Sequence, residues 1–127
     1  IKLVLEGKPF EVWGGEQLRD FTYVDDAVDA FLLAATQPRA VGGIFNVGGD
    51  AVVNLEELAA LLVQSNEGQG EFTVREFPGD RKRIDIGDYY ADDGLIRKML
   101  GWKPQVPLLE GLRRSLEFYR ENLADYQ

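Results

Sequence analysis

The chain of 127 residues contains no cysteine and no histidine, and these two absences exclude several large classes of enzyme chemistry. Without cysteine there is no disulfide framework, no thiolate nucleophile, no iron–sulfur cluster and no thiolate zinc site. Without histidine there is no imidazole base and no Ser-His-Asp triad. Serine is present only as Ser65 and Ser115. Catalysis by this chain would therefore depend on carboxylates, arginine, lysine and tyrosine.

Long apolar runs are also missing. The longest, residues 30–35 and 58–63, have six residues each, whereas a membrane-spanning helix needs about 20. The chain starts at Ile1 and no signal peptide opens it, so we expect a processed or excised piece of a longer protein. The lack of cysteine suits the cytoplasm, which is the expected location.

Positive charge is scarce in this sequence. The 22 acidic side chains outnumber the 14 basic ones, which gives a net charge of −8 and a pI near 4.5. Nucleic acids require a basic surface for their phosphates. Neither a nucleic acid nor a membrane is therefore expected as a partner, although local basic groups remain available for a small anion.

The apolar residues that are present recur at a spacing that predicts four helices. These begin near Asp25 or Asp26, at Asn54, near Asp92 and at Leu108, and they end before Pro38, before Asn66, at Leu100 and near Leu123. Asp25 and Asp26 are expected to cap the first helix. Asn54 and Glu57 form the capping-box pattern at the start of the second.

Four short segments rich in bulky and β-branched residues predict strands, at residues 10–13, 21–24, 44–47 and 72–77. Helices mixed with short strands indicate one domain over residues 1–127, of the α/β class with the character of a small α+β fold. A complete Rossmann domain is not expected, because no G-x-G-x-x-G turn opens a helix. No tyrosine is followed four residues later by the lysine that would help it abstract a proton.

Two basic groups are candidates for binding an anion. Arg19 follows the turn at Gly14–Gly15, and its guanidinium could bind a phosphate through two parallel hydrogen bonds. It could equally be a surface arginine paired with a nearby acid. The run Arg81-Lys82-Arg83 could attract an anion, or it could pair with the acids at positions 80, 85 and 88 in a solvated loop.

Aromatic side chains and one asparagine are further candidates. Phe10, Trp13 and Tyr23 could stack on a nucleobase, and packing into the core is the alternative. Asn46 could hold a substrate hydroxyl or phosphate, or it could pin the turn at Gly48–Gly49. The acids near position 25 are explained by helix capping, so no metal site is expected there.

Four stretches of the sequence resemble, in order, the motifs of one enzyme family. They are Gly7-Lys8-Pro9-Phe10-Glu11-Val12-Trp13-Gly14, then Arg19-Asp20-Phe21-Thr22-Tyr23-Val24-Asp25-Asp26, then Gly43-Ile44-Phe45-Asn46-Val47-Gly48-Gly49, and finally Leu100-Gly101-Trp102-Lys103-Pro104 followed by Glu110-Gly111-Leu112. The family is that of the extended short-chain dehydrogenase/reductases, the NAD-dependent sugar-nucleotide epimerases and dehydratases. The resemblance covers essentially the whole chain.

This resemblance implies the C-terminal, substrate-binding part of a two-part enzyme that acts on UDP- or dTDP-sugars, most similar to a UDP-glucose 4-epimerase-like isomerase. The N-terminal Rossmann domain, which binds NAD and carries the catalytic tyrosine and lysine, is missing from this chain. The chain alone is then expected to be inactive, without catalytic, NAD-binding or metal-binding residues, and the full-length enzyme is expected to be a homodimer. The alternative is a family-like module that binds nucleotide sugars, or assembles with partners, without NAD and without catalysis.

The resemblance also implies roles for single residues. Arg19 matches the arginine that binds a diphosphate oxygen, and Asn46 matches the asparagine of the NVG motif near the substrate phosphates. Glu11, Val12 and Trp13 match the strand that borders the base, partly through their backbone.

The sequence departs from the family at the second phosphate-binding arginine, which usually precedes Pro-Gly-Asp. Phe77 stands there, so the role is assigned to Arg81, with Arg83 in reserve. Excision from a larger enzyme would leave an exposed apolar face, and residues 1–5 poorly ordered or paired with new neighbours. Arg19, taken as a surface residue, is expected to matter for binding and little for stability.

Overall fold

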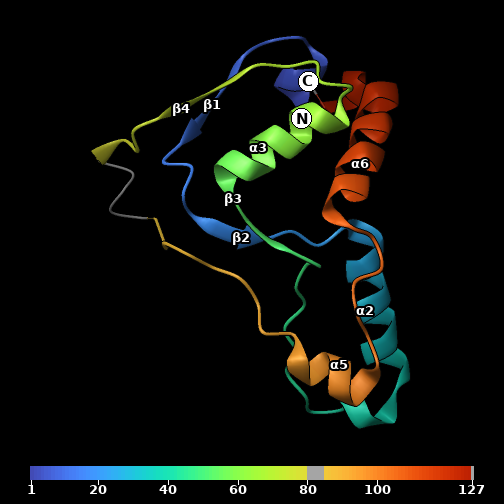
Figure 1. Ribbon diagram of the computed structural model, residues 1–127. Coiled ribbons are helices and arrows are strands. Elements are labelled where there is room, and N and C mark those ends of the chain that lie inside the picture. Colours follow the sequence, from blue (N-terminus) through green and yellow to red (C-terminus); the bar gives the residue numbers. More distant parts are fainter. Residues whose placement is uncertain (80–84, 127) are drawn as a thin grey trace.

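The structure is a computed structural model that describes residues 1–79 and 85–126, and helices and short strands alternate along it (Figure 1). The elements in chain order are α1 (Lys2–Leu5), β1 (Phe10–Trp13), β2 (Leu18–Asp20), α2 (Val24–Thr36), η1 (Pro38–Ala40), β3 (Val52–Asn54), α3 (Leu55–Ser65), β4 (Phe72–Arg75), α5 (Gly94–Leu100), α6 (Leu108–Asn122) and η2 (Leu123–Tyr126). The mixed α/β class predicted from the sequence is confirmed.

The strands of the described residues form two separate pairs. β1 lies parallel to β4, with Phe10 opposite Phe72. A parallel pair requires a long crossover between its strands, and α3 lies in that crossover and packs against β1 and α6. β2 lies antiparallel to β3, with Arg19 opposite Val53. β3 comes directly before α3 in the chain. The α3–β3 junction therefore connects the two strand pairs, as Figure 1 shows.

Apolar side chains gather in two clusters. The helices that contribute to them lie at two different ends of the ribbon in Figure 1. The first lies among α1, α3 and α6 and contains Val4, Leu62 and Leu116, with Phe10 packed against it. The second lies among α2, η1 and α5 and contains Ala30, Ala40, Ile96, Leu100 and Trp102. Both ends of the chain lie beside the first cluster.

All four predicted helices are present, as α2, α3, α5 and α6. The capping box of α3 is confirmed, because the backbone N–H of Glu57 donates to Asn54 Oδ1 over 2.7 Å and the N–H of Asn54 donates to Glu57 Oε2 over 2.9 Å. The prediction that Asp25 and Asp26 cap α2 is wrong. Its N-cap is Tyr23, and no side chain caps it.

Two of the four predicted strands are correct. β1 has the predicted bounds, and β4 covers the first four residues of the segment 72–77. Residues 21–24 are not a strand, because α2 already begins at Val24. Residues 44–47 are not a strand either, since they pair with no described strand, and Ile44 is 88% exposed. The short strands β2 and β3 were not predicted.

Residues 1–5 are not poorly ordered, which was one of the two outcomes expected for them. They form α1, and Val4 is only 3% exposed because it packs with Leu62 and Leu116 in the first cluster. This segment is therefore part of the fold.

Helix α2 carries apolar residues on both of its faces. Ala30 is buried in the second cluster, with Leu33 and Ala34 packed against it. Further apolar residues lie on the other face, where Val28 is 47%, Phe31 76% and Leu32 57% exposed. Exposed polar residues on α2, Asp25, Asp29 and Thr36, are confined to a narrower strip between these two apolar faces. The exposed apolar face expected from the sequence is thus present on α2.

No helix of the described residues is both long and apolar enough to span a membrane.

Candidate functional site

An apolar cleft of about 370 Å³ lies between β1 and α3. Its lining residues are Phe10, Glu11, Val12, Trp13, Leu55, Leu58, Ala59, Leu62 and Phe77. A second, polar cleft of about 360 Å³ is lined by Gly14, Glu16, Gln17, Phe77, Asp85 and Asp88. Phe77 is shared by both linings, so an apolar and a polar site meet at one side chain.

The three predicted base-binding residues of β1 all line the apolar cleft. Val12 is buried at 8% exposure, whereas the Glu11 carboxylate lies at the surface. Glu11 accepts hydrogen bonds from Trp13 Nε1 over 3.4 Å and from Arg75 Nε over 3.2 Å. The Trp13 ring meets the Phe77 ring edge to face, with 6.4 Å between their centroids. Aromatic faces of this kind can pack against a planar ligand.

The turn between β1 and β2 requires its glycines. Gly14 has φ +77° and Gly15 has φ +85°, a region that L-residues with a Cβ rarely adopt. A Cβ on Gly14 would also lie 2.8 Å from the Gln17 side-chain amide. This tight turn brings Gln17 back over the end of β1, where its Nε2 lies 3.5 Å from the Trp13 carbonyl oxygen.

Arg19 lies on β2, and its guanidinium is engaged by the segment 85–89. Nη1 donates to the main-chain carbonyl oxygens of Leu18, over 2.7 Å, and of Gly87. Nη2 lies 3.6 Å from Asp85 Oδ1. The Arg19 side chain is only 20% exposed. The expectation of a surface arginine is therefore corrected, and the pairing with a nearby acid that the sequence left open is present.

Backbone contacts hold the segment 85–89 along β2. The Leu18 N–H donates to Asp88 Oδ1 over 2.9 Å, and the Tyr89 N–H donates to the Leu18 carbonyl oxygen over 3.0 Å. Arg19 and Tyr89 form an isolated parallel bridge. The segment therefore places Asp85 and Asp88 on the wall of the polar cleft.

Asp20, next to Arg19 on β2, joins two of the motif segments to the stretch before α5. Its Oδ2 accepts the N–H groups of Gly49, over 3.3 Å, and of Ala91, over 3.1 Å. A Cβ on Gly49 would lie 2.3 Å from the Phe21 carbonyl oxygen, so this close approach requires glycine. The aspartate and glycine of the matched motifs thus have a structural role in packing the chain.

Asn46 lies away from both clefts. Its side chain is exposed, and Nδ2 donates to the Asp92 carbonyl oxygen over 3.3 Å, next to α5. Asn46 lines neither cleft. The predicted phosphate-binding residues Arg81 and Arg83 lie outside the described residues.

Sequence reasoning missed three residues of this site. Phe77 was noted only as a departure from the family motif, and Asp85 only as an acid near the basic run. Gln17 was not considered, although its Oε1 is buried without a hydrogen-bond partner among the described residues. The turn at Gly14–Gly15 is the one sequence signal that indicates a residue folding back over β1.

The longest helices of the described chain do not fit the pyrophosphate of NAD. Such a group binds at a glycine-rich helix N-terminus, where backbone N–H groups and the helix dipole favour negative charge. Acidic side chains stand in the first turns of α2, α3 and α6, namely Asp25, Asp26, Glu56, Glu57 and Glu110. These carboxylates repel an anion. No NAD chemistry is therefore derived from the described residues.

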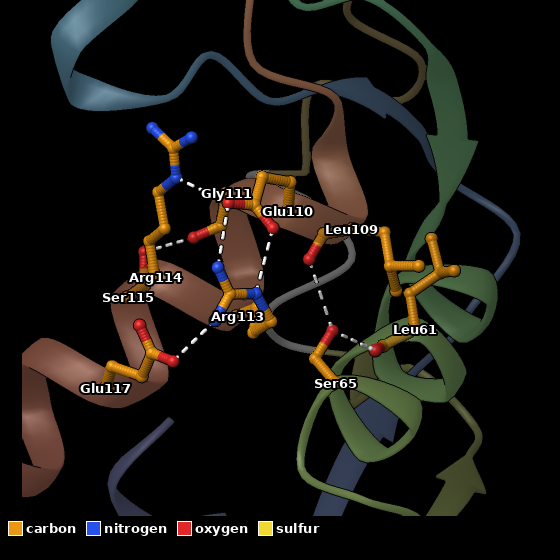
Figure 2. A network of polar contacts seen from close by, with 9 residues as sticks. All are labelled: Leu61, Ser65, Leu109, Glu110, Gly111, Arg113, Arg114, Ser115 and Glu117. Atoms are coloured by element: carbon orange, nitrogen blue, oxygen red, sulfur yellow. Dashed lines mark hydrogen bonds and ion pairs between the residues drawn. The ribbon is translucent and has the colours of Figure 1, made fainter.

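Glu110, the acid in the first turn of α6, pairs with two arginines of the same helix, as Figure 2 shows. Glu110 accepts hydrogen bonds from Arg113 Nε over 2.9 Å and from Arg114 Nε over 2.6 Å. Hydrogen bonding to Arg113, which has the largest effect, and to Arg114 lowers the pKa of Glu110 from 4.5 to about 2. Arg114 also lies over the Tyr23 ring, 5.7 Å from its centroid, which connects this network to the start of α2.

Comparison with known proteins agrees with the motifs. A family model described as the NAD dependent epimerase/dehydratase family matches residues 1–48. The chain is 34% identical over 128 residues to dTDP-glucose 4,6-dehydratase of Salmonella typhimurium, a match that covers 93% of this chain and 34% of that protein. It is 31% identical over 124 residues to UDP-glucuronate 4-epimerase of Thermodesulfobacterium geofontis, which covers 97% of this chain and 37% of that protein.

The predicted resemblance to the NAD-dependent epimerase/dehydratase family is confirmed. A solved structure of UDP-glucose 4-epimerase with UDP-glucose from Thermotoga maritima matches this epimerase/dehydratase-like fold with a TM-score of 0.80 and 30% identity. That match covers 96% of this chain and 38% of the solved one. The chain thus spans about a third of the length of the epimerases and dehydratases that it matches.

Proposed function

We propose that this chain is the C-terminal, nucleotide-sugar-binding part of an NAD-dependent sugar-nucleotide epimerase or dehydratase. Its substrate is a UDP- or dTDP-sugar, and a UDP-glucose 4-epimerase-like isomerisation is the favoured reaction. NAD and the catalytic tyrosine and lysine belong to a Rossmann domain outside these residues. Relatives that match this chain are named as dehydratases of dTDP-glucose and 4-epimerases of UDP-sugars, which supports this substrate class.

One observation carries the proposal: the apolar cleft that contains Trp13 and the polar cleft beside Arg19 meet at Phe77. A nucleoside diphosphate has the same order of parts, a planar base followed by an anionic diphosphate. The base fits the apolar cleft, where Trp13 and Phe77 present aromatic surfaces. Arg19 does not itself line the polar cleft, but its guanidinium faces Asp85 of the cleft wall at 3.6 Å, and its planar fork suits the phosphate oxygens of a diphosphate that takes the place of that carboxylate.

The exposed face of α2 supports the proposed domain arrangement. Phe31 and Leu32 present apolar surface to solvent although the opposite face of the same helix is buried in the second cluster. The matched relatives are about three times as long as this chain. We assign the α2 face to the contact with the NAD-binding part of the enzyme, because exposed large apolar side chains that gather on one face mark an interaction surface.

Calorimetric titration of the 127-residue chain with UDP, uridine and NAD tests this function. UDP is expected to bind saturably and more tightly than uridine, because only UDP offers the diphosphate to Arg19. NAD is expected to bind at least roughly tenfold more weakly than UDP, since no G-x-G-x-x-G turn opens a helix that could hold its pyrophosphate.

Failure of UDP to bind, or tighter binding of NAD than of UDP, would contradict the proposal. The sequence encoded upstream of Ile1 separates the enzyme from a binding module without NAD. The enzyme requires a glycine-rich strand-turn-helix and a Tyr-x-x-x-Lys pair there. A natural start near Ile1 would favour the binding module.

A further inference from the structure

The Arg19 guanidinium has two sides with different partners. On one side, Nη1 donates to the carbonyl oxygens of Leu18 and Gly87, which fix its position on β2. On the other side, Nη2 faces Asp85 Oδ1 at 3.6 Å, longer than the roughly 2.7–2.9 Å of a charge-assisted hydrogen bond. The two carbonyl oxygens therefore hold Nη1 closely, whereas Asp85 holds Nη2 only loosely.

Asp85 itself is held by long contacts on both of its oxygens. Its Oδ2 lies 3.5 Å from Gln17 Nε2, and this contact and the Arg19 pair are the polar contacts of its side chain among the described residues. Its side chain is only 21% exposed. A carboxylate that has lost most of its water without gaining a short hydrogen bond is poorly compensated. Moving it away from Arg19 therefore costs little.

A carboxylate and a phosphate present the same chemistry to a guanidinium, namely a pair of anionic oxygens. They cannot occupy the same side of Arg19 together, because like charges repel at that distance. Asp85 also lines the polar cleft in which the proposed diphosphate would lie. Gln17, whose buried Oε1 has no hydrogen-bond partner within residues 1–79 and 85–126, adjoins the same place.

We infer that Asp85 occupies the place of a substrate phosphate on Arg19 and leaves it when a nucleoside diphosphate binds. This inference rests on the proposed function. The carbonyl oxygens of Leu18 and Gly87 then hold Arg19 in place before the substrate arrives, and Asp85 lowers the affinity for phosphate by the free energy of the pair that must be broken. It is a specificity-determining residue, because only a ligand whose phosphates bind Arg19 more strongly than Asp85 does displaces it.

The test is a calorimetric titration of the 127-residue chain and its Asp85→Asn variant with UDP, and with uridine as the ligand without phosphates. Asp85→Asn is expected to tighten UDP binding by about fivefold and to leave uridine binding unchanged. In the Arg19→Ala background, Asp85→Asn is expected to give no gain, because the competition requires the guanidinium. If Asp85→Asn has a reduced melting temperature, Asp85→Ser gives the same comparison.

Glu16→Gln is the matched control. Glu16 lines the same cleft, so Glu16→Gln removes one negative charge from it, as Asp85→Asn does. The acid that pairs with Arg19 is Asp85 and not Glu16. A gain from Glu16→Gln as large as that from Asp85→Asn would overturn the inference, since general electrostatics would then explain both. Weaker UDP binding by Asp85→Asn would overturn it too, because Asp85 would then contact the ligand. Absence of UDP binding by the unmodified chain would instead contradict the proposed function.

Discussion

The indole N–H of Trp102 donates to the main-chain carbonyl oxygen of Asp26 over 2.9 Å, and this bond joins two sequence motifs that are 76 residues apart. The carboxylate of the same aspartate accepts the N–H of Gln105 over 2.9 Å and the N–H of Val106 over 3.0 Å. Asp26 is 2% exposed and Trp102 is 3% exposed. The start of α2 and the segment before α6 are therefore held together by one buried residue.

Replacement of Asp26 by alanine is expected to reduce the free energy of unfolding by about 2–4 kcal/mol, because the backbone N–H groups of Gln105 and Val106 both lose their charged acceptor. Urea unfolding followed by circular dichroism measures this loss. Asp25→Ala is the control, since Asp25 is an exposed neighbour in the same turn, and its loss should cost less than about 1 kcal/mol. Equal losses in the two variants would show that the buried contacts of Asp26 contribute little.

Gly49→Ala is expected to destabilise the chain strongly, because the new Cβ would lie 2.3 Å from the Phe21 carbonyl oxygen and force the backbone apart. Gly42→Ala is the comparison. Its Cβ would meet nothing within 4 Å, so only the strain of φ +75° remains, about 1–2 kcal/mol. Thermal unfolding should rank the Gly49 variant clearly below the Gly42 variant, and the reverse order would contradict the close approach.

The Glu110 network predicts a dependence of stability on pH. The folded pKa of Glu110 is about 2 against an ordinary value of 4.5, so its stabilising contribution is complete above 4.5 and is lost as the pH falls toward 2. Glu110→Gln should remove this part of the dependence. A carboxyl resonance of Glu110 that titrates near 4.5 in an NMR experiment would show that Arg113 and Arg114 do not hold the carboxylate in solution.

The exposed face of α2 predicts self-association of the chain. Phe31→Ser removes apolar surface from that face and should shift sedimentation-velocity profiles toward the monomer. Phe118→Ser serves as the control, because Phe118 is 50% exposed on α6 and does not belong to the α2 face. A chain that sediments as a monomer at every concentration would argue against the α2 face as an interface.

The sequence predicted helices better than strands, for a physical reason. Helical hydrogen bonds are local, so the capping box at Asn54 and the left-handed stop at Gly101, with φ +73°, are readable from neighbouring residues. A strand requires a partner from elsewhere. Residues 44–47 have the composition of a strand but no partner strand in the described chain, whereas β2 and β3 are short but pair with each other.

The site residues divide in the same way. Glu11, Val12 and Trp13 lie on the predicted strand 10–13, and all three line the apolar cleft, whereas their contact with a base stays a prediction. Which acid meets Arg19 is a question of tertiary structure, since Asp85 is 66 positions away in the sequence. The role of Asp26 was misjudged because an acid at a helix start is ordinarily a cap, and only the fold shows that it is buried against residues 105 and 106.

Arg19 gives the most direct measurement of the central claim, that this chain binds a nucleoside diphosphate through a guanidinium on β2. UDP and uridine are titrated into the unmodified chain, Arg19→Lys and Arg19→Ala, and urea unfolding is recorded for each. Arg19→Ala is expected to weaken UDP binding by roughly tenfold or more, with uridine binding unchanged and a stability loss of about 1–2 kcal/mol from the contacts to Leu18 and Gly87. Arg19→Lys should recover only part of the UDP affinity, because lysine keeps the charge but not the fork. Unchanged UDP affinity in a folded Arg19→Ala variant would contradict the account and leave Arg19 as a structural residue only.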